Sequence, residues 1–223
     1  MDKSVDGRCM SAKPRTSEET YGPALAMAQR ALRDSVPVDL ARRAAVPYKV
    51  LGSNRGRWEI PFFGTTHYVY WPDGDIELAQ GGQNPDIASR IILLHYLLTA
   101  DGSPLACRWI AFRSLPGGMG YEAAFEQRAG LRLAGTFGGD QKTLKDAGRR
   151  LGGEPLEFGD ASLLFRALPR VWMAIVLYVE DDEFAASANV LFDAAASNYL
   201  PTEDLAVLGG LLASRLVKAA RTT

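Results

Sequence analysis

The order in which helical and extended patterns follow one another constrains this chain more than any single motif. Apolar spacing and breaker residues predict two helices, a meander of three or four strands, a helix, a strand, two helices, four strands and a last helix. Parallel sheets require a regular alternation of strands and helices, and this order lacks it. We therefore predict an α+β fold with a mainly antiparallel sheet, packed helices and a long C-terminal helix.

Capping residues, prolines and glycines place the bounds of these elements. Helices are expected at 17–35, 37–46, 84–100, 121–129, 140–151 and 201–220. Strands are expected at 48–51, 57–62, 65–70, 76–78, 105–112, 156–158, 161–168, 171–179 and 188–192. The run at 171–178 is continuously apolar, which is typical of a central strand covered on both faces.

A chain of 223 residues is long enough to bury a sizeable core. It contains no linker, repeat or low-complexity segment, so we predict a single domain over 17–221. Residues 1–16 offer almost nothing to bury and are predicted to be a flexible N-terminal tail.

Charge and composition argue against several classes of function. The chain has 25 Lys and Arg against 26 Asp and Glu, and a net charge of −1 argues against a nucleic-acid binder. No apolar run approaches the ~18–20 residues of a membrane span. The N-terminus lacks the apolar stretch of a secretory signal, so a cytoplasmic location is expected.

The chain has only 2 Cys and 2 His, which are too few for a disulfide framework or a self-contained zinc site. Cys9 lies in the predicted tail and Cys107 in a predicted strand. We therefore expect one mobile thiol, one buried thiol and no bridge between them. No metal site is predicted.

A glycine-rich loop after the predicted strand at 105–112 is the best local candidate for a ligand site. It contains Gly117, Gly118 and Gly120, and a helix is expected to begin near Tyr121. Amides at a helix start bind anions, and Arg113 would add a charged group. The pattern matches no known phosphate-loop motif, so a tight turn that only glycine adopts is the competing interpretation.

His95 and Asp193 are two further candidates. His95 lies in the most apolar predicted helix, where it is either a hydrogen-bonded core residue or an axial ligand or proton shuttle. Asp193 follows a predicted strand and is either a functional carboxylate or the cap of the next turn. The acidic run at 180–183 lacks the spacing of a calcium loop and is predicted to be a solvated turn. No sequence signature of serine, cysteine or zinc-protease catalysis is present.

Four phrases together resemble the prokaryotic domain-of-unknown-function family DUF3786. They are ILLHYLLTADG at 92–102, WIAFRSLPGG at 109–118, LGGEP at 151–155, and LFD with YLPTEDL within 191–205. The resemblance implies a cytoplasmic bacterial or archaeal domain, and that some relatives carry a fused four-cysteine iron–sulfur domain of the type found beside corrinoid proteins. This chain lacks the cysteines for such a cluster, so a redox, iron–sulfur or corrinoid protein would be a separate partner.

The resemblance transfers no catalytic residues, and three hypotheses of function follow. The first is a binding module for an anionic or tetrapyrrole- or corrinoid-like small molecule, beside a redox partner, with its cofactor unidentified. The second is an enzyme on a small polar substrate that uses His95, Tyr121, Arg113 or Asp193 in acid–base chemistry. The third is a structural or interaction subunit that uses the apolar face of the last helix. That face carries Leu205, Leu208, Leu211, Leu212 and Leu216.

Overall fold

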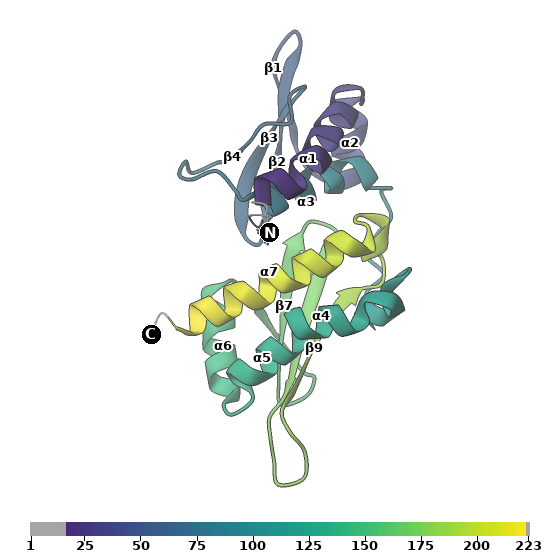
Figure 1. The fold of residues 1–223 in the computed structure, drawn as a ribbon. Helices are drawn as coiled ribbons and strands as arrows, with labels where there is room; N and C mark the ends of the chain where they lie inside the picture. Colours follow the sequence, from purple (N-terminus) through teal and green to yellow (C-terminus); the bar gives the residue numbers. More distant parts are fainter. Residues whose placement is uncertain (1–16, 222–223) are drawn as a thin grey trace, which may run out of the picture.

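The computed structural model describes residues 17–221 and confirms the α+β class (Figure 1). Its first half consists of three helices and one antiparallel sheet. The elements are α1 (Ser17–Arg33), α2 (Pro37–Ala44), β1 (Tyr48–Gly52), β2 (Arg55–Phe62), β3 (Thr65–Trp71), β4 (Ile76–Leu78) and α3 (Ile87–Thr99). The sheet order is β1-β2-β3-β4, so the predicted meander is confirmed.

The second half contains a five-stranded antiparallel sheet and four helices. Its strands are β5 (Trp109–Ala111), β6 (Glu154–Leu156), β7 (Ala161–Leu168), β8 (Val171–Tyr178) and β9 (Ser187–Asp193). Its helices are α4 (Glu122–Arg128), α5 (Gly130–Phe137), α6 (Gln141–Arg150) and α7 (Thr202–Ala220), with short 3₁₀ turns at 112–114, 118–121 and 196–198. The order β5-β9-β8-β7-β6 places β8 at the centre, as its apolar run predicts.

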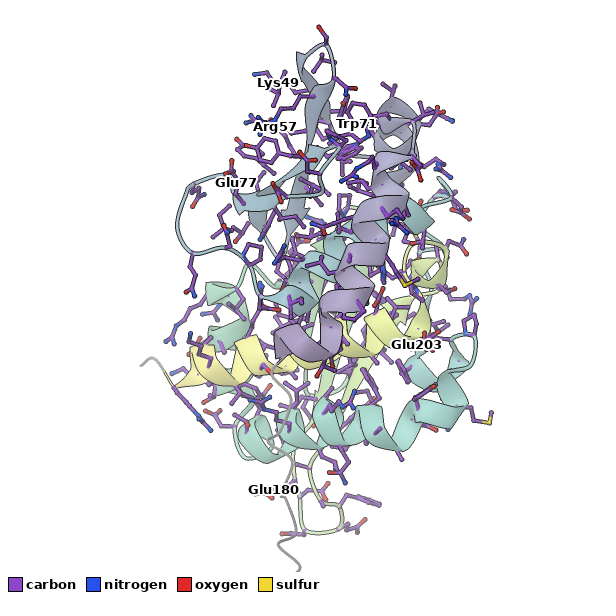
Figure 2. All side chains as sticks on the ribbon, turned by 45° about the horizontal axis from the view of Figure 1, so that its top comes forward. Lys49, Arg57, Trp71, Glu77, Glu180 and Glu203 are labelled. Atoms are coloured by element: carbon purple, nitrogen blue, oxygen red, sulfur yellow. The ribbon has the colours of Figure 1, made fainter. Side chains whose placement is uncertain are left out.

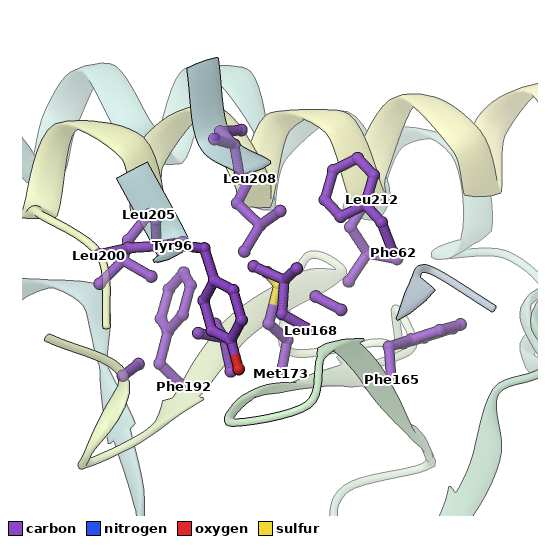
Figure 3. Packing of buried hydrophobic residues seen from close by; sticks show 14 of the residues in the cluster. Phe62, Tyr96, Phe165, Leu168, Met173, Phe192, Leu200, Leu205, Leu208 and Leu212 are labelled. Atoms are coloured by element: carbon purple, nitrogen blue, oxygen red, sulfur yellow. The ribbon is translucent and has the colours of Figure 1, made fainter. Parts of the chain in front are cut away.

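One continuous hydrophobic core joins the two halves (Figure 3). Phe62 from the first sheet and Tyr96 from α3 belong to the same buried cluster as Met173 from the second sheet. Leu208 and Leu212 on α7 belong to it too, so the apolar face of the last helix packs into the core of the chain itself. The described residues contain no helix long and apolar enough to span a membrane.

Two expectations about the middle of the chain are wrong. The strand expected at 105–112 is formed only at Trp109–Ala111, and Cys107 is exposed rather than buried. Cys107 has a φ of 52°, a left-handed conformation that a strand does not tolerate. Helix α5 was not predicted, because Gly130 and Gly135 read as breakers. The predicted tail and Cys9 lie outside the described residues.

Candidate functional site

The two halves of the fold enclose a cavity of about 440 Å³. This volume is within the range of small-molecule sites, and such sites favour junctions between structural units. The first half contributes the segments after α2 and around the β2–β3 turn, and the second contributes the α6–β6 turn and β7. The lining residues are Ala45, Pro47, Pro61, Phe63, Gly64, Leu151, Gly152, Glu154, Phe165, Arg166, Leu168 and Pro169.

The turn between β2 and β3 positions an aromatic ring in the cavity wall. Phe62 pairs with Thr65, so Phe63 and Gly64 form a two-residue hairpin turn, with φ values of 47° and 77°. A turn with two positive φ values favours Asn-Gly, and an aromatic residue at its first position is conformationally unfavourable. The N–H of Phe63 donates to the carbonyl of Ala167 at 2.9 Å, which fixes the turn against the second half.

A cation from α7 lies against the same turn. The guanidinium of Arg215 is 4.6 Å from the centre of the Phe63 ring and 5.4 Å from that of Phe62. Burial lowers the pKa of Arg215, and the negative charge of Asp86 partly offsets that effect. Phe63 therefore contacts α7 as well as the cavity.

The polar part of the cavity wall is an ion pair. Arg166 and Glu154 form a bidentate pair with N–O distances of 2.6 and 3.0 Å. The guanidinium carbon of Arg166 also lies 5.0 Å from the centre of the Trp172 ring. The two charges compensate each other, so the cavity offers hydrogen-bonding groups without a net charge.

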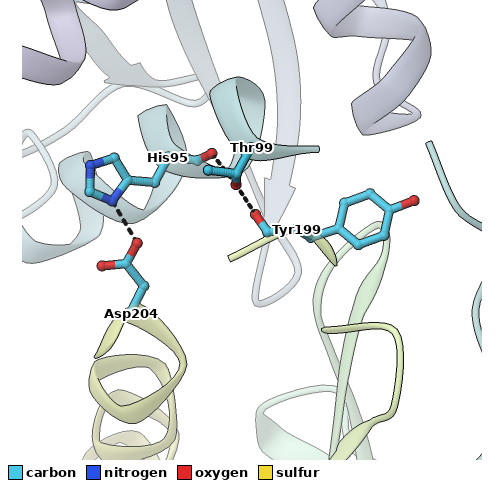
Figure 4. Close-up of polar contacts among 4 residues, drawn as sticks. All are labelled: His95, Thr99, Tyr199 and Asp204. Carbon is cyan, nitrogen blue, oxygen red and sulfur yellow. Dashed lines mark hydrogen bonds and ion pairs between the residues drawn. The ribbon is translucent and has the colours of Figure 1, made fainter. Parts of the chain in front are cut away.

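His95 pairs with a carboxylate from the other half of the molecule (Figure 4). Its Nδ1 lies 2.6 Å from Oδ2 of Asp204, in the first turn of α7. The hydrogen bond to Asp204 raises the pKa of His95, and burial works against that rise. His95 is thus a hydrogen-bonded residue at the joint between α3 and α7.

Neighbouring hydrogen bonds strengthen this joint. The hydroxyl of Thr99 donates to the carbonyl of Tyr199, as Figure 4 shows. The hydroxyl of Tyr96 donates to the carbonyl of Ala44 at 2.7 Å and accepts from the N–H of Arg170 at 3.2 Å. Helix α3 is therefore bonded both to its own half and to the second half.

We expect the stability that the His95–Asp204 pair contributes to be complete below pH 6.5 and to be lost as pH rises through the raised pKa of His95. Deprotonation removes the charge that attracts the carboxylate. The measurement is urea unfolding of the wild type and His95→Gln across this window. The difference in unfolding free energy should be large at pH 6 and small at pH 9.

Asp204→Asn serves as the matched variant for this pH series. It removes the charge from the other side of the pair, so it should abolish the same pH-dependent component. A His95→Gln difference that does not change with pH would show that the imidazole acts only by packing.

The glycine loop has the geometry of a tight turn. A Cβ on Gly118 would lie 2.1 Å from the carbonyl oxygen of Phe112, and Gly117 has a φ of 73°. Gly120 has open space around its Cα. The backbone therefore requires glycine at two of the three positions.

The side chains beside this loop point to solvent. Arg113 is exposed and lies 3.9 Å from Glu122, and Tyr121 is also exposed. Neither residue lines any of the five cavities described for residues 17–221. The anion-binding role of the loop stays a prediction.

Asp193 is buried and caps the chain that follows β9. Its Oδ1 accepts from the N–H of Ala106 and from the N–H of Ala195, both at 2.9 Å. The same carboxylate thus holds the end of β9 and the segment before β5. Of the two interpretations of Asp193, this geometry matches the cap.

The glycine loop and the His95–Asp204 pair both contact the first turn of α7, since the hydroxyl of Thr202 donates to the carbonyl of Pro116 at 2.7 Å. His95 is at the α3–α7 joint, the glycine loop precedes α4, and Asp193 ends β9. Among the residues that the structure describes, no group of three or more His, Cys, Asp or Glu side chains is arranged to hold a metal ion. One sequence feature could have indicated the cavity. Phe63-Gly64 is a two-residue hairpin turn that carries an aromatic residue at the position where asparagine is favoured.

Comparison with known proteins identifies the family. No curated protein and no solved structure matches the chain. Residues 37–215 match the model of a family described as a domain of unknown function, DUF3786. The match covers most of both halves and the whole cavity wall. The chain therefore belongs to the DUF3786 family.

Proposed function

We propose that this chain is a small-molecule-binding domain whose ligand occupies the cavity between the two halves. The cavity is lined mainly by proline, leucine and phenylalanine side chains and has one bidentate ion pair, Glu154–Arg166. A pocket with apolar walls and a few placed polar groups is the usual form of such a site. The ligand class is an uncharged, mainly apolar molecule with one polar group that faces this pair.

The side chains of the cavity wall limit the classes of ligand that the cavity favours. Among residues 17–221, Arg166 is the only basic residue that lines the cavity, and Glu154 neutralises it, so these walls favour an uncharged ligand over an anion. In the part of the chain that the structure describes, the lining residues include no histidine, cysteine or methionine that could serve as an axial ligand to the metal of a tetrapyrrole or corrinoid. A separate redox or iron–sulfur/corrinoid partner stays a prediction.

The observation that best supports the proposal is the left-handed backbone conformation of Phe63 in the cavity wall. Its left-handed backbone is unfavourable for an aromatic residue, and Asn at this position would suit the turn better. Strained residues of this kind persist where the surroundings hold them, often at ligand sites. In this position the ring forms part of the cavity wall.

We expect Phe63→Asn to weaken binding of Nile red, an uncharged apolar dye, by at least about tenfold while the protein stays folded. The substitution removes a wall of the cavity and installs Asn-Gly, the preferred turn. Binding is measured by fluorescence titration, and folding by thermal unfolding of the same samples.

The matched control is Phe184→Asn, since Phe184 is a largely exposed aromatic residue in the β8–β9 loop. It should leave dye binding unchanged. Pro61→Trp, which fills the cavity from its rim, should also abolish binding. If the wild type and both cavity variants bind Nile red with equal affinity, the cavity is not the ligand site.

The enzyme hypothesis has one observation in its favour, the imidazole–carboxylate pair of His95 and Asp204. Such a pair orients a general base in many enzymes. Neither residue lines any of the five cavities described for residues 17–221, whereas the Glu154–Arg166 pair lines the cavity between the two halves. We therefore favour the hypothesis of a binding domain over that of an enzyme.

A further inference from the structure

The second sheet holds the Glu154–Arg166 pair of the cavity wall in a defined orientation. Glu154 on β6 lies opposite Leu164 on β7, so its side chain is on the same sheet face as that of Arg166, two residues further along β7. Trp172 on β8 lies opposite Arg166, and the centre of its ring is 5.0 Å from the guanidinium carbon. The strand register and the aromatic contact therefore limit the rotation of the guanidinium.

The pairing leaves hydrogen-bonding groups available on both side chains. Nη1 and Nη2 of Arg166 each carry two hydrogens, and the bidentate contact uses one hydrogen of each. Each carboxylate oxygen of Glu154 likewise keeps a lone pair. The side chains are 54% exposed for Arg166 and 47% exposed for Glu154, so ligand atoms can reach these groups. An N–H donor on Nη1 and an acceptor on Oε1 thus lie side by side, 2.6 Å apart.

We propose that the polar group of the ligand is a carboxamide whose N–H and C=O lie on the same side, as in a primary amide or a lactam. This inference rests on the proposed function of the cavity. The amide oxygen accepts from Nη1 of Arg166, and the amide N–H donates to Oε1 of Glu154. The oxygen and nitrogen of an amide are about 2.2 Å apart by its bond lengths, close to the 2.6 Å between their two partners. The apolar remainder of the ligand contacts Phe63, Phe165 and Leu168.

Other polar groups satisfy only one of the two partners. A carboxylate accepts from Arg166 but places its negative charge beside Glu154, and an ammonium group places its positive charge beside Arg166. A hydroxyl has one oxygen for two partners, which bends both hydrogen bonds. A secondary amide in its trans form directs its N–H away from its carbonyl oxygen. Glu154 is therefore the residue that selects against acids, and Arg166 is the residue that selects against amines.

The test measures how well four compounds displace Nile red from the full chain. They are octanamide, N-methyloctanamide, octanoate and octylammonium, each used below its micelle concentration. All four carry the same apolar chain length, so differences in affinity report the polar group. Octanamide should bind on the order of tenfold more tightly than each of the others, because it alone makes both charge-assisted hydrogen bonds.

Two substitutions should change this order in opposite directions. Glu154→Gln leaves Arg166 without its negative partner, so the affinity for octanoate should rise on the order of tenfold above that of the wild type. Arg166→Gln leaves Glu154 uncompensated and should raise the affinity for octylammonium by a similar factor. A purely structural role of the pair would change the affinities for all four compounds in parallel. Circular dichroism confirms that each variant is folded.

Glu59→Gln is the matched control, because it breaks a similar pair on the other sheet. Arg57 lies beside Lys49 across the β1–β2 ladder (Figure 2). Its guanidinium is 3.0 Å from Glu59 and 3.6 Å from the centre of the Tyr68 ring. Neither Arg57 nor Glu59 lines any of the five cavities described for residues 17–221, so the order of the four affinities should stay as in the wild type.

The outcomes separate this inference from the proposed function. A wild type that binds no Nile red would contradict the proposed function and this inference with it. If Nile red binds but octanoate displaces it as well as octanamide does, the cavity holds apolar molecules and the ion pair does not recognise a carboxamide. The same conclusion follows if Glu154→Gln leaves the relative affinities of octanamide and octanoate unchanged.

Discussion

Asp193→Ala is expected to lower the free energy of unfolding by about 2–4 kcal/mol, since two buried or partly buried N–H donors lose their acceptor. These donors are the amides of Ala106 and Ala195, each 2.9 Å from Oδ1 of the carboxylate. The loss would loosen both the end of β9 and the segment that leads into β5. Urea unfolding followed by circular dichroism measures it.

Asp181 provides a matched comparison for this prediction. Its Oδ1 also accepts two backbone N–H groups, from Glu183 and Phe184, but in an exposed loop where water replaces a lost acceptor. Asp181→Ala should therefore cause a much smaller loss than Asp193→Ala. If Asp193→Ala instead leaves stability intact and impairs ligand binding, the carboxylate acts on a ligand and is not a cap.

Gly118→Ala is expected to lower the free energy of unfolding by about 2–3 kcal/mol. The added Cβ would lie 2.1 Å from the carbonyl oxygen of Phe112, and this neighbour is backbone that cannot rotate away. Relief requires the turn before α4 to shift, together with the stacked rings of Phe112 and Phe125. Thermal unfolding and near-ultraviolet circular dichroism would report both changes.

Gly120→Ala is the control two residues further on. Nothing lies within 4 Å of the position that its Cβ would take, so stability should be nearly unchanged. Equal and small effects at both positions would mean that the loop tolerates side chains, and would favour the interpretation that its glycines admit a ligand.

The elements that could be predicted are those with strong local signals. Pro37 and Pro47 bracket α2, and the apolar run of β8 gives its length and its central position. Helix α5 could not be predicted, because burial of Leu133 and Phe137 in the core outweighs the helix-breaking tendency of its glycines. The strand expected at 105–112 is shorter than predicted because of another contact that is distant in the sequence. The carboxylate of Asp193, 87 residues away, accepts a hydrogen bond from the N–H of Ala106.

The candidate cavity could not be predicted from local patterns. Its walls come from segments around Phe63 and around Phe165, which are far apart in the sequence and meet only in the folded chain. One interpretation of His95 gives it a hydrogen-bonding partner, but local patterns do not identify that partner, because Asp204 is 109 residues away. Periodicity identifies faces of helices and strands, and it does not reveal which faces meet.

The hydrogen bonds between α3 and α7 can form only after the last helix has been synthesised. The ribosome releases α3 long before α7, yet the Asp204 that pairs with His95 belongs to the last helix. Until α7 emerges, Phe62 in the nascent first half lacks the Arg215 side chain that lies over its ring, and exposed apolar surface on a nascent chain attracts chaperones. Translation arrest before residue 202 should therefore leave a polypeptide that chaperones hold and proteases degrade, and completion of α7 should release it.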